Sequence, residues 1–329
     1  MELIWKLVET TFSIMHLDVV DALRAFFIFA ACTILSISVP DTLRARFVTY
    51  GARATSTTVG SRPLARADAP DTSRVYLALD YLASLRVPHS YFKHFYVASV
   101  LSSLFWAFQL LFRGSAFQAI ATRIGPQHLQ KSMSIHQVLL CWALMLVQGI
   151  RRLHESCIFS KPSSSRMWFV HWLLGLAFYL AATVAVWIEG TVPTLLGTLT
   201  THKLTLDDVQ VTTAPTLRTF LCLPLFLIAS GIQHDCHHYL FSLKKYTLPT
   251  HPMFRRIVCP HYTAECVIYL SLALLAAPDG EMVNKTLLSC FAFVTVNLGV
   301  TAAISKRWYE QKFGPDAVKE RWNMIPGLF

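Results

Sequence analysis

The sequence predicts an all-α membrane protein, a polytopic bundle of about seven transmembrane helices. Hydrophobic residues make up 54% of the 329 residues, only 15% are charged, and the mean hydropathy is +0.45. A soluble domain carries about 25% charged residues. Apolar runs also recur along the whole chain, and Trp and Tyr lie near the ends of several of them, as is typical of membrane interfaces.

Seven apolar runs predict the membrane helices. They span residues 22–39, 92–112, 135–150, 168–188, 217–232, 264–277 and 287–304. Some are short or interrupted, and the run at 264–277 is marginal in length. We expect residues 1–90 to form an N-terminal anchor helix with a flexible cytosolic loop at 53–69, within a long polar segment at 41–88. Residues 91–329 then form a multi-helix domain, and residues 190–213 form a polar lumenal loop.

The charge distribution predicts the orientation. The net charge is +10, and when loops are assigned alternately to the two sides, one side holds twenty Lys and Arg residues and the other six. The positive-inside rule places the richer side, which includes the C-terminus, in the cytosol. The positive charge is thereby explained by orientation and lipid contact, and we predict no nucleic-acid partner. A sequon at Asn284 falls on the lumenal side, too close to the membrane to be used.

A dense set of polar groups interrupts the apolar pattern between 230 and 265. It comprises Gln233, His234, Asp235, His237, His238, His261 and Glu265. We expect residues 233–238 at the end of a membrane helix, and such groups are costly there unless they are functional. A histidine box for two irons would need further boxes, which the chain lacks. A zinc site from His234, Cys236, Cys259 and His261 matches no common ligand spacing, so we predict no metal.

Two other stretches carry candidate chemistry. Gln148, Arg152 and Glu155 recur at helical spacing, which predicts one stripe that faces the interior of the bundle. The C-terminal stretch from Tyr309 to Arg321 is rich in cations, which suits either phosphate binding or contact with anionic lipids. The chain has no Gly-x-Gly-x-x-Gly or Walker motif, so any nucleotide would bind between helix ends and loops.

These pieces together resemble the steroid 5-alpha-reductase family, membrane enzymes that reduce double bonds with NADPH. The matching motifs occur in family order over about residues 85–329: Gln148-x-x-Arg-Arg-Leu-x-Glu155, Gln233-His-x-Cys-His237, Pro260-His-Tyr-x-x-Glu265, Trp308-Tyr-x-x-Lys-Phe313 and Arg321 with the terminal Ile-Pro-x-Leu-Phe329. Gln233-His-x-Cys-His237 and the stretch from Val87 to Tyr96 most resemble the polyprenol reductase branch.

The resemblance implies roles for individual residues. It implies NADPH as the cofactor, held by residues 148–329, with contacts at Arg152, Gln233, His237, Lys244, Tyr246, Tyr309 and Arg321. Glu265, His261 and Tyr262 are predicted to be catalytic, at the polar end of the substrate pocket. The chain departs from steroid-reducing members at Gln233, His237, His261 and Thr301. Their catalytic Tyr falls near Gly149, so the proton donor is not assigned.

The branch implies the reduction of the α-isoprene double bond of polyprenol or polyprenal, in the endoplasmic reticulum, to make dolichol for protein glycosylation. Hydride adds readily to a double bond that is conjugated with a carbonyl, which favours the aldehyde. A steroid or enoyl-CoA reductase is the alternative within the enzyme class. A membrane lipid carrier or transporter is the alternative of another class. That class predicts an internal repeat in the sequence, and none is apparent. The oligomeric state is left open.

Overall fold

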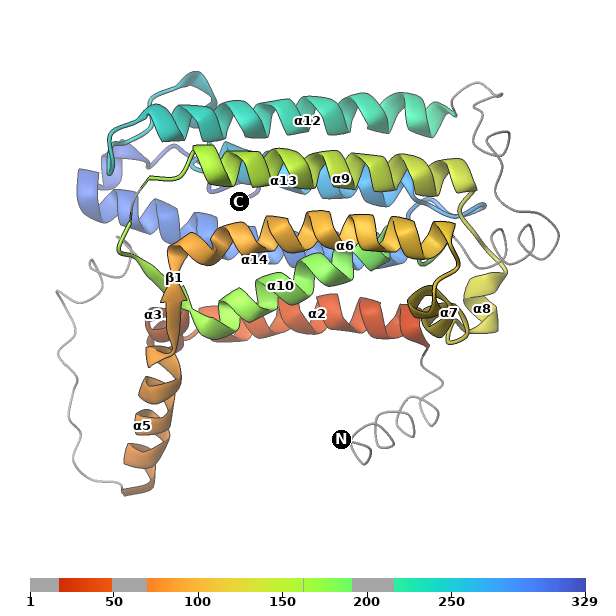
Figure 1. Cartoon of the computed structure of the whole chain (residues 1–329). Coiled ribbons are helices and arrows are strands. Elements are labelled where there is room, and N and C mark those ends of the chain that lie inside the picture. The colour runs from red at the N-terminus through yellow and green to blue at the C-terminus, as the bar shows by residue number, and fades with distance from the viewer. Residues whose placement is uncertain (1–17, 49–69, 162, 191–215) are drawn as a thin grey trace.

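A computed structural model describes residues 18–48, 70–161, 163–190 and 216–329. In these ranges the chain forms a bundle of long helices that run side by side (Figure 1). These are α2 (Val19–Ser38), α6 (Lys93–Leu111), α9 (Ile135–Ile158), α10 (Phe169–Ala185), α12 (Leu217–Ser242), α13 (Pro260–Leu275) and α14 (Lys285–Phe313). Each of them overlaps one of the predicted apolar runs over most of its length. The prediction of an all-α membrane bundle is therefore confirmed.

Four stretches within the described residues are long and apolar enough to cross a membrane. They are α2, His89–Leu111 including α6, α12 and α14, and α10 is a shorter apolar helix. The helices α9 and α13 carry polar groups that lower their hydropathy, although they lie among the others (Figure 1). The count of seven crossings therefore stays a prediction.

Several helices continue beyond the apolar run that predicted them. The helix α9 extends to Ile158, α12 to Ser242 and α14 to Phe313. Residues 233–238 lie near the end of α12, as predicted, and the helix continues for about one further turn to Ser242. Gln233, His234 and His237 do not end the helix, since their side chains find hydrogen-bond partners on neighbouring helices.

The order of packing brings sequence-distant helices together. The helix α13 packs between α12 and α14, α14 also packs on α2, and α6 packs between α9 and α10. Phe178 of α10 is buried in this core, with ring centroids 4.8 Å from Phe293 of α14 and 6.0 Å from Phe27 of α2. The apolar core is therefore shared by the first, middle and last parts of the chain.

Short elements join the long helices. They are α3 (Asp41–Phe47), α5 (Pro70–Ser84), β1 (Arg86–Pro88), η1 (His89–Phe92), α7 (Ser115–Ala121), α8 (Pro126–Leu129), β2 (Arg166–Trp168), η3 (Pro252–Phe254) and η4 (Pro315–Ala317). The strands β1 and β2 pair antiparallel, with Arg86 opposite Trp168. The predicted polar segment at 41–88 thus contains two helices. The predicted loops at 53–69 and 191–213 lie outside the described residues.

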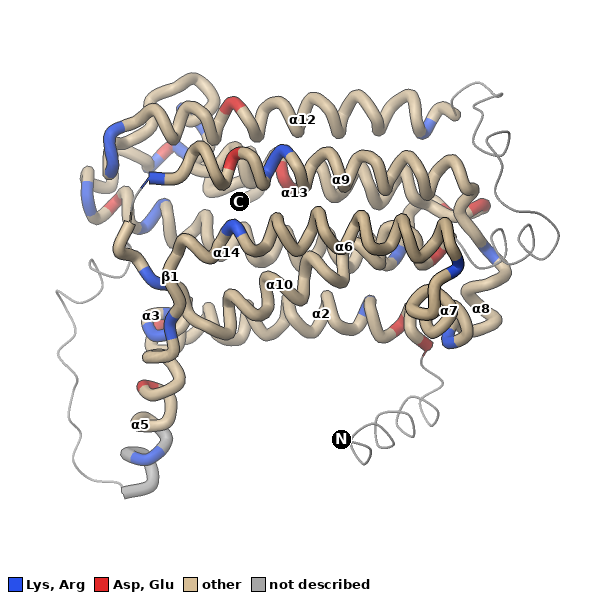
Figure 2. The backbone as a smooth tube through the Cα atoms, in the orientation of Figure 1, with Lys and Arg blue, Asp and Glu red and all other residues tan. Residues whose placement is uncertain are grey.

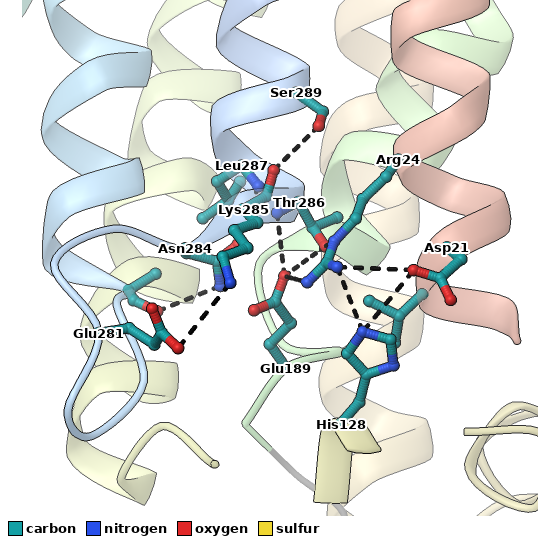
Figure 3. A network of polar contacts seen from close by, with 12 residues as sticks. Asp21, Arg24, His128, Glu189, Glu281, Asn284, Lys285, Thr286, Leu287 and Ser289 are labelled. Atoms are coloured by element: carbon teal, nitrogen blue, oxygen red, sulfur yellow. Dashed lines mark hydrogen bonds and ion pairs between the residues drawn. The ribbon is translucent and has the colours of Figure 1, made fainter. Parts of the chain in front are cut away.

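The two ends of the bundle differ in character. Lys and Arg gather at the end that carries the α12–α13 connection and the last residues of the chain (Figure 2). At the other end, Arg24 of α2 donates from Nη2 to Glu189 Oε1 at 2.9 Å and from Nε to Thr286 Oγ1 at 3.1 Å (Figure 3). This polar network fastens the start of α2 to the start of α14 and to the chain after α10.

The sequon residue Asn284 belongs to the same end. Its side chain is fully buried and caps α14, because Oδ1 accepts from Leu287 N at 2.9 Å and Nδ2 donates to Ala276 O at 3.1 Å. The sequence predicted that the sequon is unused because it lies too close to the membrane. The structure supplies a different obstacle, since the acceptor nitrogen lies inside the fold.

Candidate active site

The centre of the site is a buried carboxylate on α9. Glu155 is 2% exposed and forms ion pairs with Arg151 and Arg152. Its two oxygens also lie 2.7 Å from His234 Nδ1 and 2.8 Å from His237 Nδ1 of α12. A buried carboxylate is tolerated when cationic and hydrogen-bonding groups surround it. Glu155 therefore ties the polar faces of α9 and α12 together.

Gln233 connects this cluster to α13. Its Oε1 accepts from Gln148 Nε2 at 2.8 Å and from Arg151, and its Nε2 donates to the carboxylate of Glu265. Both sides of the amide are thus used, so its orientation is fixed by its acceptor contacts. As a result, Gln233 presents an N–H to Glu265.

Arg152 reaches in the opposite direction, to α6. Its Nη2 donates to Tyr96 Oη at 2.6 Å, and its guanidinium carbon lies 4.8 Å from the centre of the Tyr96 ring. Arginine only donates hydrogen bonds, so this contact leaves the O–H of Tyr96 available to donate elsewhere. Tyr96 is buried and was not among the predicted site residues.

These groups line one cavity within the bundle, with a volume of about 160 Å³. Its lining residues are Phe92, Phe95, Tyr96, Arg152, His171, Leu174, Gly175, Phe178, Tyr179, Gln233, His237, Tyr262, Glu265, Tyr269, Phe293, Val294, Asn297, Leu298 and Thr301. A cavity of about 150 Å³ holds one benzene ring. The cavity therefore has room for one ring or one isoprene unit, with polar groups at the α9, α12 and α13 wall.

The structure divides the predicted residues into two groups. Five of them, Arg152, Gln233, His237, Tyr262 and Glu265, line the cavity. His261 is buried beside it, with its ring centroid 4.3 Å from that of Tyr262 and 5.3 Å from that of His237.

The other four predicted residues lie outside the cavity, where Lys and Arg gather. The ring of Trp308 lies 6.1 Å from that of Tyr246 and 5.1 Å from that of Tyr309. Lys244 precedes Tyr246 in the α12–α13 connection and is exposed. Arg321 donates to Pro249 O at 3.0 Å, so the chain terminus is held against the same connection.

Sequence reasoning missed Tyr96, although the stretch that carries the branch resemblance ends on it. The predicted interior stripe was right, because Gln148 and Glu155 are buried and Arg152 lines the cavity. Asn297 and Tyr179 also line the cavity. Their positions inside apolar runs resemble ordinary packing positions, so the sequence offers no signal for them.

Comparison with known proteins gives the family of this chain. The model of the 3-oxo-5-alpha-steroid 4-dehydrogenase family matches residues 164–329, which include α10, α12, α13 and α14. The chain is 28% identical over 291 residues to polyprenal reductase 1 of Oryza sativa subsp. indica, covering 74% of this chain and 80% of that protein. It is 26% identical to the polyprenal reductase of Caenorhabditis elegans over 260 residues, which cover 74% of this chain and 79% of the relative.

A fungal relative extends the same pattern. The polyprenal reductase of Saccharomyces cerevisiae (strain ATCC 204508 / S288c) is 26% identical over 244 residues, covering 74% of this chain and 76% of that protein. The chain therefore belongs to the 3-oxo-5-alpha-steroid 4-dehydrogenase family of oxidoreductases, in its polyprenal reductase branch.

Proposed function

We propose that this protein reduces the double bond next to the aldehyde of polyprenal, with NADPH as the reductant. Its product, dolichal, would lead to dolichol for protein glycosylation in the endoplasmic reticulum membrane, with the C-terminus in the cytosol. The observation that carries the proposal is the cavity, where Tyr96, Arg152 and Glu265 form a polar wall beside apolar side chains such as Phe95 and Phe178. The relatives that bear the name polyprenal reductase support the substrate.

The residues present suit a nicotinamide nucleotide. The cavity has room for one ring, and Arg152, Gln233 and His237 line it. The end of the bundle that carries Lys244 and Arg321 is rich in Lys and Arg (Figure 2). Cations of this kind hold phosphates through charge-assisted hydrogen bonds. We assign these two residues to the phosphates of the nucleotide, and Tyr246 and Tyr309 to its outer part.

A bound reduced nicotinamide would supply a hydride to the β carbon of the conjugated aldehyde. The electron pair of the double bond then moves toward the aldehyde oxygen, where negative charge develops. We assign Tyr96 to donate a hydrogen bond to that oxygen, since its own oxygen already accepts from Arg152. The cation beside the phenol would stabilise the developing charge, which is an arrangement that catalytic sites use for enolates.

The α carbon must then receive a proton. We assign this step to Glu265, which would carry the proton on Oε1 as a carboxylic acid and become a carboxylate in the step. Its side chain lines the cavity, and its Oε2 accepts from Gln233. Tyr262 lines the same wall and lies beside His261. We propose that these two residues connect Glu265 with the end of the bundle where Lys and Arg gather. Hydride and proton together saturate the double bond and leave the aldehyde unchanged.

The size of the cavity adds a constraint on the substrate. One isoprene unit fills about as much space as the cavity offers, so the ring of the cofactor and the reacting unit need more room than 160 Å³. Phe92, Phe95 and Leu174 form the wall between α6 and α10. We propose that this wall moves apart when the substrate enters and that the polyprenyl tail leaves there into lipid.

The experiment uses the purified full-length protein in lipid nanodiscs with NADPH. Polyprenal, polyprenol and a 3-oxo-4-ene steroid are offered separately, and NADPH oxidation is followed by absorbance with product masses. We expect oxidation with polyprenal and a product heavier by two hydrogens that retains the aldehyde. Glu265→Gln in the same nanodiscs is the control, and a lower rate of NADPH oxidation in this variant shows that the reaction depends on the site.

Other outcomes would redirect the proposal. Turnover of the steroid alone would assign the protein to steroid reduction, and turnover of polyprenol alone would overturn the aldehyde mechanism. If no substrate oxidises NADPH and NADPH does not bind to the folded protein, the reductase function itself is overturned. A parallel assay with NADH tests whether the cationic end selects the additional phosphate of NADPH.

A further inference from the structure

The helix α5 lies outside the bundle and points away from it. The long helices share one direction, whereas α5 projects sideways from the end near α3 (Figure 1). This is the end where Lys and Arg gather (Figure 2). If the long helices cross a membrane, α5 therefore lies along the plane of its surface.

One face of α5 is held by the protein. Asp80 accepts from Arg46 Nε of α3 at 2.7 Å, and the guanidinium of Arg46 lies 5.4 Å from the centre of the Tyr76 ring. The Trp168 Nε1 of β2 donates to Leu82 O at 2.9 Å. The pairing of β1 with β2 then fixes the chain directly after α5. The orientation of α5 is thus set by four contacts on three elements.

The remaining face of α5 is apolar and exposed. Leu77 and Tyr81 are 66% and 67% exposed, and Leu82 and Leu85 are 43% and 38% exposed. Leu77 and Tyr81 are four residues apart, so they form one stripe along the helix, and Leu85 directly follows its last residue. The described side chains of the protein leave this stripe largely uncovered.

We propose that α5 is an interfacial helix that lies on the membrane surface, with this stripe at the boundary of lipid headgroups and acyl chains. A helix with one apolar face, parallel to the membrane and flanked by cations, binds lipid in this way. Tyr81 suits this depth because its ring is apolar and its hydroxyl is polar.

The choice of lipid as the occupant follows from the surroundings. The neighbouring helices α2 and α6 also expose large apolar side chains, including Phe29 at 76% and Leu101 at 62%. The helix α5 is attached at the level where the long helices end, next to α3 (Figure 1). A membrane that covers α2 and α6 would therefore reach α5 without any further partner.

The test places a fluorophore that senses polarity at Leu77. The full-length protein carries Leu77→Cys together with Cys32→Ser and Cys157→Ser, which remove the two exposed cysteines, and is reconstituted in phosphatidylcholine vesicles with anionic lipid. Quenching is measured with spin labels placed near the carbonyl end or near the methyl end of the acyl chains. Leu101→Cys on α6 gives the value for immersion, and Lys319→Cys, on an exposed loop residue, gives the value for water.

We expect the label at Leu77 to emit at shorter wavelength than the label at Lys319. The shallow spin label should quench it several-fold more strongly than the deep one, whereas Leu101 should show the reverse preference. Emission and quenching at Leu77 equal to those at Lys319 would overturn the proposal. Emission at short wavelength without quenching by lipid would overturn it too, since a protein surface would then cover the stripe.

A second variant tests the stripe itself. The reporter moves to Leu85→Cys, and Leu77→Asp with Tyr81→Asp replaces two apolar groups of the same face by charges. We expect lipid quenching at residue 85 to fall at least severalfold while NADPH oxidation shows whether the bundle remains folded. Unchanged quenching in the folded variant would contradict the assignment of this face to lipid.

Discussion

Gln233 and Glu265 meet across the contact of α12 with α13, and the amide nitrogen of Gln233 donates to the carboxylate of Glu265. The other end of the same amide accepts from Gln148 and Arg151 of α9. The orientation of Glu265 therefore depends on α9 indirectly, because groups on α9 orient the amide that donates to it. The catalytic assignment of Glu265 and the positioning of its side chain can thus be separated by mutation.

Glu265→Gln is expected to lower kcat by about 100-fold or more, because the amide cannot supply the proton that the α carbon requires. Gln233→Ala should lower kcat less, since the carboxylate remains but loses its fixed orientation. The measurement is NADPH oxidation with polyprenal under saturating conditions. Equal losses in the two variants would contradict the separation of a catalytic and a positioning role.

Tyr96→Phe is expected to lower kcat by about 100-fold, with little change in KM. The ring and its packing against Arg152 are kept, and only the hydroxyl that faces the aldehyde oxygen is lost. Tyr269→Phe, which removes another phenol of the same cavity, is the matched control. A loss in the control as large as that in Tyr96→Phe would remove the special role of Tyr96.

Gly175→Ala is expected to raise KM for polyprenal. A Cβ at position 175 would lie 2.6 Å from two ring atoms of Phe95, so the ring must move, and it lines the cavity. Overpacking costs on the order of 1 kcal/mol, which corresponds to about fivefold in KM.

The companion change Phe95→Leu should restore KM in the double variant, because the smaller side chain makes room for the added methyl group. If the change in KM of the double variant is merely the sum of the changes in the two single variants, the contact between residue 175 and Phe95 is not the cause of the higher KM.

Arg24→Met is expected to destabilise the protein by about 2 kcal/mol while leaving kcat unchanged. The substitution removes the cation beside Glu189, which is 7% exposed and would keep only its contacts with Thr286. Thermal unfolding in detergent measures the loss of stability. Arg123→Met, on an exposed residue of the same end, is the control, and a similar loss there would contradict the prediction.

A pH dependence follows from Asp18, the residue that caps α2. Burial raises the pKa of this carboxyl, but hydrogen bonds from the Asp21 N–H, from His128 and from the Gly125 N–H outweigh it and hold the pKa below its ordinary value. A lowered pKa in the folded state means that the ionised form stabilises the fold. The contribution is complete above the ordinary pKa of an Asp and is lost as the pH falls through the folded-state pKa.

Asp18→Asn is therefore expected to lower the melting temperature at neutral pH, by a loss of about 1 kcal/mol. The difference from the parent protein should shrink at acidic pH, below about pH 4. Melting curves of both proteins over a pH series measure this. A difference that stays constant across the series would contradict a role for the charge of Asp18.

The bundle could be predicted because apolar runs carry its signal directly. The exact ends of the helices could not be predicted, since α12 continues through Gln233 and His237, whose polar groups are satisfied by partners on α9 and, for Gln233, also on α13. Those partners are distant in sequence. The interior stripe of α9 could be predicted, because Arg152 and Glu155 follow the spacing that places residues on one face of a helix.

The phenol of the cavity shows where sequence reasoning ends. The catalytic Tyr of steroid-reducing members falls near Gly149 in this chain, and a Cβ at that position would lie 3.1 Å from Ser99 Oγ, because α6 and α9 approach closely there. Tyr96 lies one helical turn before Ser99 on α6, and its phenol enters the cavity from that side. A single phenol position cannot be inferred from motif order, since it depends on which helix supplies the wall.

The buried cap at Asn284 links sugar attachment to the timing of folding. On the side that the positive-inside rule assigns to the lumen, a glycosyltransferase can reach this amide only before α14 closes over it. A chain that acquires a glycan there carries a bulky sugar on the buried nitrogen that binds Ala276 O, so it cannot rebuild the cap. Occupancy of the sequon would therefore record the fraction of newly made chains that folded too slowly.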